Sequence, residues 1–190
     1  MKICLLGDTG VGKTCLCRNL TGEDFDKYLE PTIGASFYSI YLKNHLDDKA
    51  HFWDTAGQER YRSLTNMYVR GCDVIILVLS KKGDWMNSLD YWIKFYDKYK
   101  EIQTRLIIVF SKIDKKNQLP TNDDLSIVKS YIKSFNLQCN IIQHSSFSNI
   151  ASDEIRNELI ELSKYNAKFK PKKNSLNLKK RDEYYCCTIL

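Results

Sequence analysis

The chain has 190 residues, of which 43% are hydrophobic and 27% charged, so it suits one compact domain with a short tail and excludes two full domains or global disorder. Its 8 glycines and 3 prolines exclude collagen-like chains, and the absence of a membrane-span-length apolar run or a signal peptide leads us to expect folding in the cytosol. The net charge of +6 arises after position 163, where eight basic and two acidic residues lie. A basic end points to an anionic membrane or a nucleic acid as partner, although charge alone favours the alternative of a solvated, disordered end.

Short apolar runs alternate with helical patterns along the chain. The predicted strands cover residues 2–6, 36–43, 50–53, 74–79, 105–110 and 139–143, and the predicted helices cover residues 13–20, 60–68, 88–99, 123–135 and 152–165. The runs at 74–79 and 105–110 are apolar throughout, which is typical of parallel strands buried on both faces. Residues 36–53 partly alternate around a polar turn and predict an antiparallel edge hairpin. The order predicts an α/β fold with a doubly wound, six-stranded, mostly parallel sheet, helices on both faces, and a ligand at the carboxyl ends of the strands.

A phosphate-binding loop follows the first predicted strand. Residues 7–14, Gly-Asp-Thr-Gly-Val-Gly-Lys-Thr, fit G-x-x-x-x-G-K-[ST] between a strand and a helix, which is the context that this motif requires. Backbone N–H groups and the helix N-terminus would hold phosphate oxygens, Lys13 would add a positive charge, and the Thr14 hydroxyl would ligate Mg²⁺. A glycine-rich turn without a ligand is the alternative. The motif therefore predicts a P-loop NTPase fold.

A second phosphate-contacting segment, WDTAGQE at residues 53–59, follows another apolar strand. Asp54, at a strand end beside the phosphate loop, is placed to hold a metal-bound water, with an ordinary strand-end cap as the alternative. Gly57 lets its backbone N–H approach a γ-phosphate, and the Gln58 carboxamide offers both a donor and an acceptor to an attacking water. Although D-x-x-G is weak alone, behind a phosphate loop it indicates nucleotide hydrolysis.

The segments GDTGVGKT, PTIG and WDTAGQERYRSLT resemble the Ras superfamily of small GTPases, and within it the Rab family, over residues 2–165 and again at the terminal cysteines. The resemblance implies that Thr32 completes Mg²⁺ coordination, that Asp54 holds Mg²⁺ through water, and that the catalytic residues are Gln58 and Lys13. It implies slow hydrolysis, with an arginine finger supplied by an activating protein. The nucleotide contacts that it implies are Thr9, Gly10, Val11, Gly12, Lys13, Thr14, Cys15, Phe25, Thr32, Gly57, Lys112, Asp114, Ser145, Ser146 and Phe147.

The resemblance also implies a set of partners. Phe37, Trp53 and Tyr68 match the apolar triad that many Rab proteins show to effectors, with simple core packing as an equal alternative. An exchange factor, a GTPase-activating protein, a GDP dissociation inhibitor and a prenylation escort protein are also implied. A monomer without a nucleic-acid partner is expected, at the cytoplasmic face of intracellular membranes and cycling with the cytosol.

The base site departs from the family pattern. The family reads guanine with Asn-Lys-x-Asp, whereas residues 111–114 here are Ser-Lys-Ile-Asp. Asp114 can accept two hydrogen bonds that guanine offers and adenine does not. The family's Ser-Ala-Lys appears as Ser-Ser-Phe at residues 145–147, so Phe147 cannot supply the usual lysine contact. With the short side chain of Ser111, this predicts nucleotide affinity weakened by roughly tens of fold and faster release.

The end of the chain carries a lipidation signal. Helical periodicity stops where a small GTPase domain of residues 1–165 is predicted to give way to a flexible, basic hypervariable tail of residues 166–190. Residues 187–190, Cys-Thr-Ile-Leu, form a C-a-a-X box whose final Leu favours geranylgeranylation. Cys186 and Cys187 are both candidate sites, and two lipid chains, or one with the basic patch, would anchor the protein to a membrane stably. Two free thiols in a frayed tail are the alternative.

Four functions are weighed against these patterns. The leading hypothesis is a GTP-hydrolysing, membrane-anchored switch in vesicle traffic, with GTP or GDP as ligand and Mg²⁺ as cofactor. The alternative is a prenylated nucleotide sensor that hydrolyses little and cycles by exchange, and single-turnover phosphate release distinguishes the two. An ATP-using P-loop kinase is disfavoured by Asp114, and a nucleic-acid role would leave the terminal cysteines unexplained.

Overall fold

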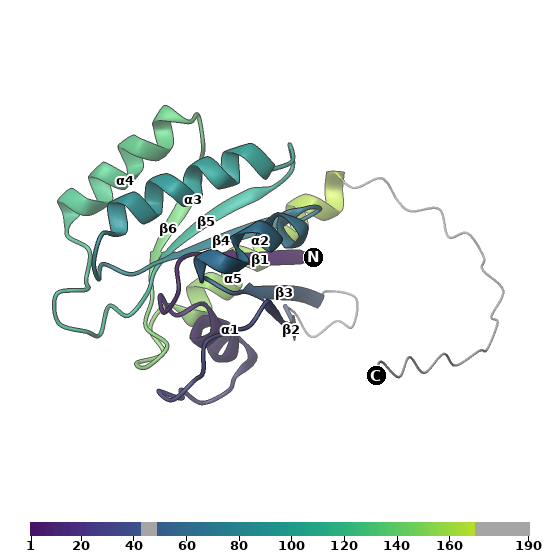
Figure 1. Ribbon diagram of the computed structural model, residues 1–190. Coiled ribbons are helices and arrows are strands. Elements are labelled where there is room, and N and C mark those ends of the chain that lie inside the picture. Colours follow the sequence, from purple (N-terminus) through teal and green to yellow (C-terminus); the bar gives the residue numbers. More distant parts are fainter. Residues whose placement is uncertain (43–48, 170–190) are drawn as a thin grey trace.

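The computed structural model describes residues 1–42 and 49–169. Helices cover both faces of one mixed sheet (Figure 1). The strands are β1 (Lys2–Leu6), β2 (Ala35–Tyr41), β3 (Lys49–Thr55), β4 (Val74–Leu79), β5 (Arg105–Phe110) and β6 (Cys139–Gln143). The helices are α1 (Lys13–Thr21), the short 3₁₀ turn η1 (Glu59–Tyr61), α2 (Arg62–Val69), α3 (Trp85–Tyr99), α4 (Asn122–Ser134) and α5 (Ser152–Phe169).

The sheet has the strand order β2-β3-β1-β4-β5-β6, with β2 and β3 antiparallel and every other pair parallel. This confirms the predicted α/β fold with its edge hairpin. Because helices cross over both faces, successive residues of a central strand are buried on opposite sides. Ile3 and Leu5 belong to the core shared with α1 and α5, whereas Cys4 and Leu6 belong to the core shared with α3 and α4.

The starts of two helices are set by capping residues that periodicity does not reveal. α3 begins at Trp85, three residues before the predicted start, because the Asp84 carboxylate accepts a backbone N–H of the first turn at 3.3 Å. α4 begins after a capping box in which Thr121 and Asp124 each accept the other's backbone N–H. Its start at Asn122 lies one residue before the predicted one.

The hairpin and the last helix also differ in length from the prediction. β3 runs to Thr55, two residues further than predicted, because Asp54 and Thr55 still pair with β2. α5 continues to Phe169, beyond the predicted end at residue 165. Most of the polar turn of the hairpin and nearly all of the predicted tail, with Cys186 and Cys187, lie outside the described residues.

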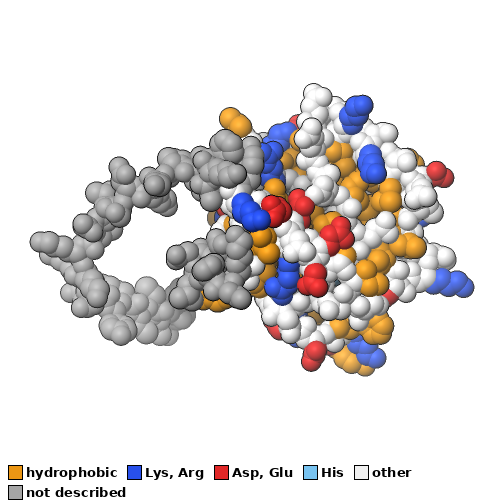
Figure 2. Space-filling view, turned by 180° about the vertical axis from the view of Figure 1, so that it is seen from behind, with side chains coloured by type: hydrophobic (Ala, Val, Ile, Leu, Met, Phe, Trp, Pro, Cys, Tyr) orange, Lys and Arg blue, Asp and Glu red, His pale blue; other side chains and the backbone are white. Residues whose placement is uncertain are grey.

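The charged side chains show no separation of sign on the face drawn in Figure 2, where acidic and basic groups are interspersed among apolar ones. This fits the balance of 21 basic and 21 acidic residues that precede residue 164. Within residues 1–42 and 49–169, no helix is both long and apolar enough to span a bilayer.

A buried polar cluster joins α1, the end of β6 and the start of α5. The Asn19 Oδ1 lies 3.2 Å from Nε2 of His144 and accepts a hydrogen bond from the Ser152 hydroxyl. His144 is fully buried, and its Nδ1 has no hydrogen-bond partner among the described residues. Burial lowers the pKa of His144 to about 4, and the Asp114 carboxylate opposes this only in part. The fold is therefore built around a neutral imidazole.

We expect His144 to make the folded state sensitive to acid. Its pKa is about 4 in the folded state and about 6.5 in the unfolded chain, so the unfolded state binds more protons between these values. The free energy of unfolding should therefore fall by about 3 kcal/mol as the pH drops through this window. His144→Gln should lose this part of the pH dependence. Urea unfolding at neutral pH and at about pH 4 measures the free energy of unfolding of both proteins.

An equal loss of stability in acid for wild type and His144→Gln would contradict this expectation. NMR titration of the wild-type imidazole provides an independent check, because a pKa near its ordinary value would contradict it as well.

Candidate functional site

A pocket of about 290 Å³ lies at the carboxyl ends of the strands, where the element order predicted a ligand. The predicted nucleotide contacts that line it are Thr9, Gly10, Gly12, Lys13, Thr14, Cys15, Phe25, Thr32, Gly57, Lys112, Asp114, Ser146 and Phe147. Val11 and Ser145 are buried and are not among the lining residues. The sequence did not predict eight further lining residues, which are Asp26, Lys27, Leu29, Glu30, Pro31, Thr55, Ser111 and Lys115. Of these, Ser111 was identified only as a departure from the family's base motif. Most of them lie between Phe25 and Thr32, and this position between two predicted nucleotide contacts is the only feature of the sequence that could have indicated them.

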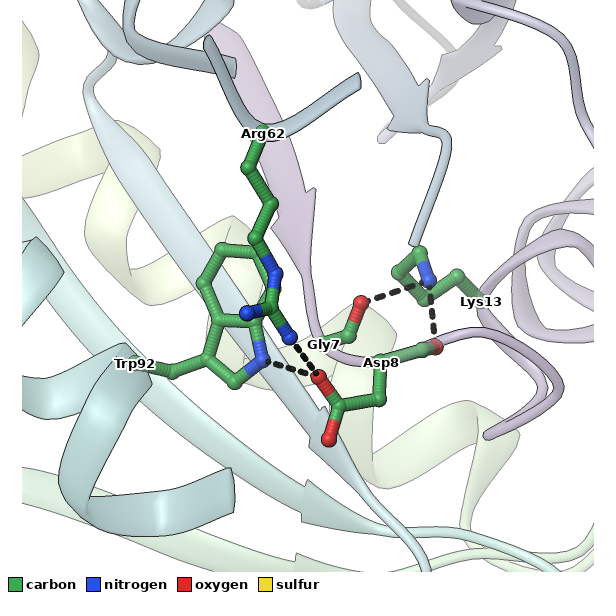
Figure 3. A network of polar contacts seen from close by, with 5 residues as sticks. All are labelled: Gly7, Asp8, Lys13, Arg62 and Trp92. Atoms are coloured by element: carbon green, nitrogen blue, oxygen red, sulfur yellow. Dashed lines mark hydrogen bonds and ion pairs between the residues drawn. The ribbon is translucent and has the colours of Figure 1, made fainter. Parts of the chain in front are cut away.

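The phosphate loop ends at Gly12, the N-cap of α1. Its φ of 106° is a left-handed conformation that L side chains rarely adopt, so glycine suits this position. The buried Lys13 ammonium donates to the carbonyls of Gly7 and Asp8, both at 2.8 Å (Figure 3). Burial lowers the pKa of Lys13 to about 8, and the Asp54 and Asp8 carboxylates oppose this shift. A positive charge is thus held at the centre of the loop.

Three oxygen groups meet beside the start of α1. The Asp54 Oδ2 accepts the Thr14 hydroxyl at 2.7 Å and the Thr32 hydroxyl at 3.2 Å, and the two hydroxyl oxygens are 3.0 Å apart. Asp54 is fully buried, and its Oδ1 has no hydrogen-bond partner within the described part of the chain. Burial raises the pKa of Asp54, while the Thr14 hydroxyl and the Lys13 ammonium lower it. A buried carboxylate with one unpaired oxygen beside two hydroxyls fits the oxygen ligands that Mg²⁺ prefers.

The segment after β3 lies directly against the phosphate loop. A Cβ on Gly57 would stand 2.4 Å from main-chain atoms of Asp8 and Thr9, so a larger residue requires a backbone shift. The Ala56 backbone N–H donates to the Gly34 carbonyl at 2.8 Å. The two segments that carry the predicted γ-phosphate contacts are therefore tied to each other as well as to the loop.

The predicted catalytic glutamine makes a hydrogen bond with a neighbouring arginine. The Gln58 Oε1 accepts the Arg60 Nε–H at 2.7 Å, and Gln58 does not line the pocket. This contact uses one acceptor position of the carboxamide, which keeps a second acceptor position and two donors. The catalytic role of Gln58 stays a prediction.

The other end of the pocket carries the predicted base-reading residues. The Ser145 hydroxyl donates to Oδ1 of Asp114 at 2.5 Å, and the carboxylate keeps further acceptor positions. The Lys112 ammonium donates to the Gly10 carbonyl, so the Lys112 stem spans from the base end to the phosphate loop. Burial lowers the pKa of Lys112.

Ser111, which departs from the family pattern, is buried between the phosphate loop and the sheet. Its hydroxyl contacts the carbonyl of Val11 and, at 3.0 Å, the carbonyl of Leu79. The two carbonyls share one hydrogen-bond donor, because a serine hydroxyl has a single proton. The short side chain still reaches the phosphate loop.

The predicted effector triad forms a continuous row of rings. The Phe37 and Trp53 ring centroids are 5.3 Å apart, and those of Trp53 and Tyr68 are 5.5 Å apart. Phe37 is 55% exposed, whereas Trp53 and Tyr68 are partly buried and pack on the core shared with α3 and α4. The row therefore combines core packing with one exposed ring.

A polar network that no sequence pattern indicated lies behind the phosphate loop. The Asp8 carboxylate points away from Lys13 and accepts Arg62 Nη2 at 3.2 Å and Trp92 Nε1 at 3.0 Å (Figure 3). The Arg62 guanidinium also lies 4.3 Å from the centroid of the Tyr91 ring. The network connects the phosphate loop to α2 and α3. Its hydrogen bonds join residues 54 and 84 positions apart, so no local motif marks it.

Comparison with known proteins agrees with this geometry. The family model described as "Ras of Complex, Roc, domain of DAPkinase" matches residues 2–114. Ras-related protein RABC1 of Arabidopsis thaliana is 40% identical over 121 residues, covering 62% of this chain and 57% of that protein. Ras-related protein Rab-22A of Homo sapiens is 44% identical over 97 residues, covering 50% of each chain. Ras-related protein SEC4 of Saccharomyces cerevisiae is 35% identical over 125 residues, covering 65% of this chain and 58% of that protein.

The extent of these matches defines what they show. The chain spans between half and three fifths of the length of these curated relatives. The family model covers more than half of the chain and includes the phosphate loop, Thr32, the segment after β3 and Asp114. The chain therefore belongs to the Ras-type domain family that this model describes, and it is similar to the Ras-related relatives named above over 50% to 65% of its length.

Proposed function

We propose that this protein is a GTP-binding switch that hydrolyses GTP slowly to GDP and phosphate. The observation that carries the proposal is the pairing of Asp54 with the hydroxyls of Thr14 and Thr32 at one end of the pocket. At the other end, Ser145 holds the Asp114 carboxylate. The first end suits a triphosphate with its metal ion, and the second suits guanine, whose N1–H and exocyclic amine both donate to a carboxylate.

The residues of the chain bind and orient the triphosphate. Backbone N–H groups of the phosphate loop and of the start of α1 surround the phosphates, and the Lys13 ammonium neutralises their outer charge. When bound, Mg²⁺ would be held by Thr14, Thr32 and, through water, Asp54, and would supply further positive charge to the phosphates. The Gln58 carboxamide orients the attacking water. Since no arginine lines the pocket among the described residues, an activating protein supplies that charge.

Gln58→Leu should lower single-turnover GTP hydrolysis by at least about tenfold and leave GTP affinity nearly unchanged. Leucine keeps a similar size but has neither donor nor acceptor, so the water is no longer oriented, whereas phosphate and base contacts remain. Phosphate release from GTP-loaded protein measures the first effect, and equilibrium binding measures the second.

The matched control is Gln103→Leu, which makes the same chemical change at an exposed position after α3. It should hydrolyse GTP like the wild type. Equal hydrolysis by Gln58→Leu and wild type would remove Gln58 from its assigned role.

Wild-type protein that binds GTP without releasing phosphate would instead favour the second candidate, a prenylated sensor that cycles by exchange. The contact between Gln58 and Arg60 is the observation that favours this candidate.

Loss of the γ-phosphate is proposed to release both segments that contact it. Thr32 belongs to the connection between α1 and β2, and Gly57 belongs to the segment after β3, so GTP would order both and GDP would free both. The row of Phe37, Trp53 and Tyr68 is the proposed effector surface. Effector capture by GTP-loaded but not by GDP-loaded protein tests this coupling, and equal capture by both forms contradicts it.

The base site is proposed to hold nucleotide less tightly than an asparagine-containing site. The single Ser111 proton is shared between two backbone carbonyls, so the hydroxyl cannot also donate toward a ligand. A GDP release rate of the purified protein no faster than that of its Rab relatives would contradict this proposal.

The tail is proposed to anchor the protein to the cytoplasmic face of intracellular membranes in vesicle traffic. Geranylgeranyl chains on Cys186 and Cys187, with the basic residues around them, would hold it there. An exchange factor, an activating protein, a GDP dissociation inhibitor and a prenylation escort protein would be its regulators. Replacement of both cysteines by serine should keep the protein in the soluble fraction of cells, and undiminished membrane pelleting would argue against lipid anchoring.

A further inference from the structure

We propose that Phe147 is a positioning residue of the base site, whose ring holds Phe25 edge-on beside the base and slows nucleotide release. The inference rests on the proposed function, since it requires a guanine nucleotide in the pocket. The two ring centroids are 5.5 Å apart with planes at 83°, an edge-to-face arrangement that aromatic rings favour. Both residues line the pocket. Phe147 follows Ser145, which binds Asp114, so the pair lies at the base end.

The loop that carries Phe147 is closed by hydrogen bonds. Ser145 and Ile150 exchange two backbone hydrogen bonds, at 3.4 and 3.0 Å, and the Ser148 backbone N–H donates to the Ser145 hydroxyl at 3.1 Å. The Asn149 Oδ1 accepts a hydrogen bond at 3.0 Å from the side-chain amide of Asn19, which lies on α1. Because the loop is bonded both to itself and to α1, it presents the Phe147 ring from a defined position.

Phe25 lies on a segment without regular secondary structure. Residues 22–34 contain no helix or strand, and Phe25 is 44% exposed. Within the described residues, the contact with Phe147 is the one aromatic contact that Phe25 makes. A ring on such a segment keeps its orientation only if a partner restrains it, and Phe147 supplies that partner from the hydrogen-bonded loop.

The exposure of Phe147 argues against a role in the core. Phe147 is 68% exposed and is one of the residues that line the pocket. A pair of exposed aromatic rings in a pocket offers a flat purine apolar and edge-on contacts that water does not provide. Phe147 thereby takes over part of the contact that the missing lysine would make, by aromatic packing in place of charge.

The test compares GDP release rates of single variants. Phe147→Ala should release GDP roughly 3- to 10-fold faster than wild type, the range expected for loss of one aromatic pair. Phe147→Tyr, which keeps the ring, should retain the wild-type rate. Ile127→Ala, which removes an exposed apolar side chain of α4 outside the pocket, is the matched control and should release GDP like wild type.

A double-variant cycle with Phe25→Ala tests whether Phe147 acts through Phe25. In the Phe25→Ala background, the further change Phe147→Ala should add little, because the pair is already lost. Full additivity of the two effects, or an unchanged release rate in Phe147→Ala, would overturn this inference alone. Failure of the wild-type protein to take up any guanine nucleotide in the presence of Mg²⁺ would overturn the proposed function together with it.

Discussion

Asp114→Asn is expected to lower GDP affinity by roughly 10²- to 10⁴-fold and to raise affinity for xanthosine diphosphate. The Asp114 carboxylate can accept from both the N1–H and the exocyclic amine of guanine, whereas asparagine keeps the shape but replaces one acceptor with a donor. Xanthine has a carbonyl where guanine has the amine, so it accepts at the position where guanine donates. The substitution therefore turns a favourable contact with guanine into an unfavourable one and does the reverse for xanthine. Equilibrium binding of both diphosphates to the full chain measures the change.

The structure provides both the reason for choosing Asp114 and a control. The Ser145 hydroxyl holds one oxygen of Asp114 at 2.5 Å, so the carboxylate is already oriented before any base enters. Asp97→Asn makes the same change at an exposed position of α3, where the carboxylate pairs with Lys100 at 2.7 Å. This control should leave both affinities unchanged. If Asp114→Asn bound GDP as well as wild type, Asp114 would not read the base.

Gly57→Ala is expected to lower GTP affinity by roughly 10- to 100-fold and to leave GDP affinity almost unchanged. The added Cβ would stand 2.4 to 2.5 Å from main-chain atoms of Asp8 and Thr9, which cannot turn aside as the end of a flexible side chain can. The segment after β3 must then retreat from the phosphate loop. Its backbone N–H would lose a hydrogen bond to the charged γ-phosphate, a group that GDP lacks. The ratio of GTP to GDP affinity measures the effect.

A second glycine separates this contact from a general loss of stability. Gly83 has a φ of 76°, and a Cβ there meets no atom within 4 Å. Gly83→Ala should therefore lower the free energy of unfolding by about 1 kcal/mol through backbone strain and leave the affinity ratio unchanged. An equal loss of GTP and GDP affinity in Gly57→Ala would show damage to the whole site and would contradict the proposed γ-phosphate contact.

The phosphate half of the site and the sheet could be predicted because their signals are contiguous. Residues 7–14 form one unbroken motif between a strand and a helix, and Gly12 and Lys13 take the places that the motif gives them. The strands Lys2–Leu6 and Val74–Leu79 have the predicted ends because apolar runs bounded by polar residues mark both. Helix starts were less predictable, since Asp84 and Thr121 act as caps through side-chain orientation.

The sequence by itself determined which segments form strands, which residues are predicted to contact phosphates and a guanine base, and which family the motifs resemble, because periodicity and motif spacing are local properties of the chain. Only the tertiary structure decided that Asp8 binds Arg62 and Trp92, and that Phe147 packs on Phe25. It also decided that Gln58 contacts Arg60 instead of the pocket. Such contacts depend on the pairing of distant segments across the sheet and on the rotamer that each side chain adopts among its neighbours. A local sequence pattern predicts neither of them.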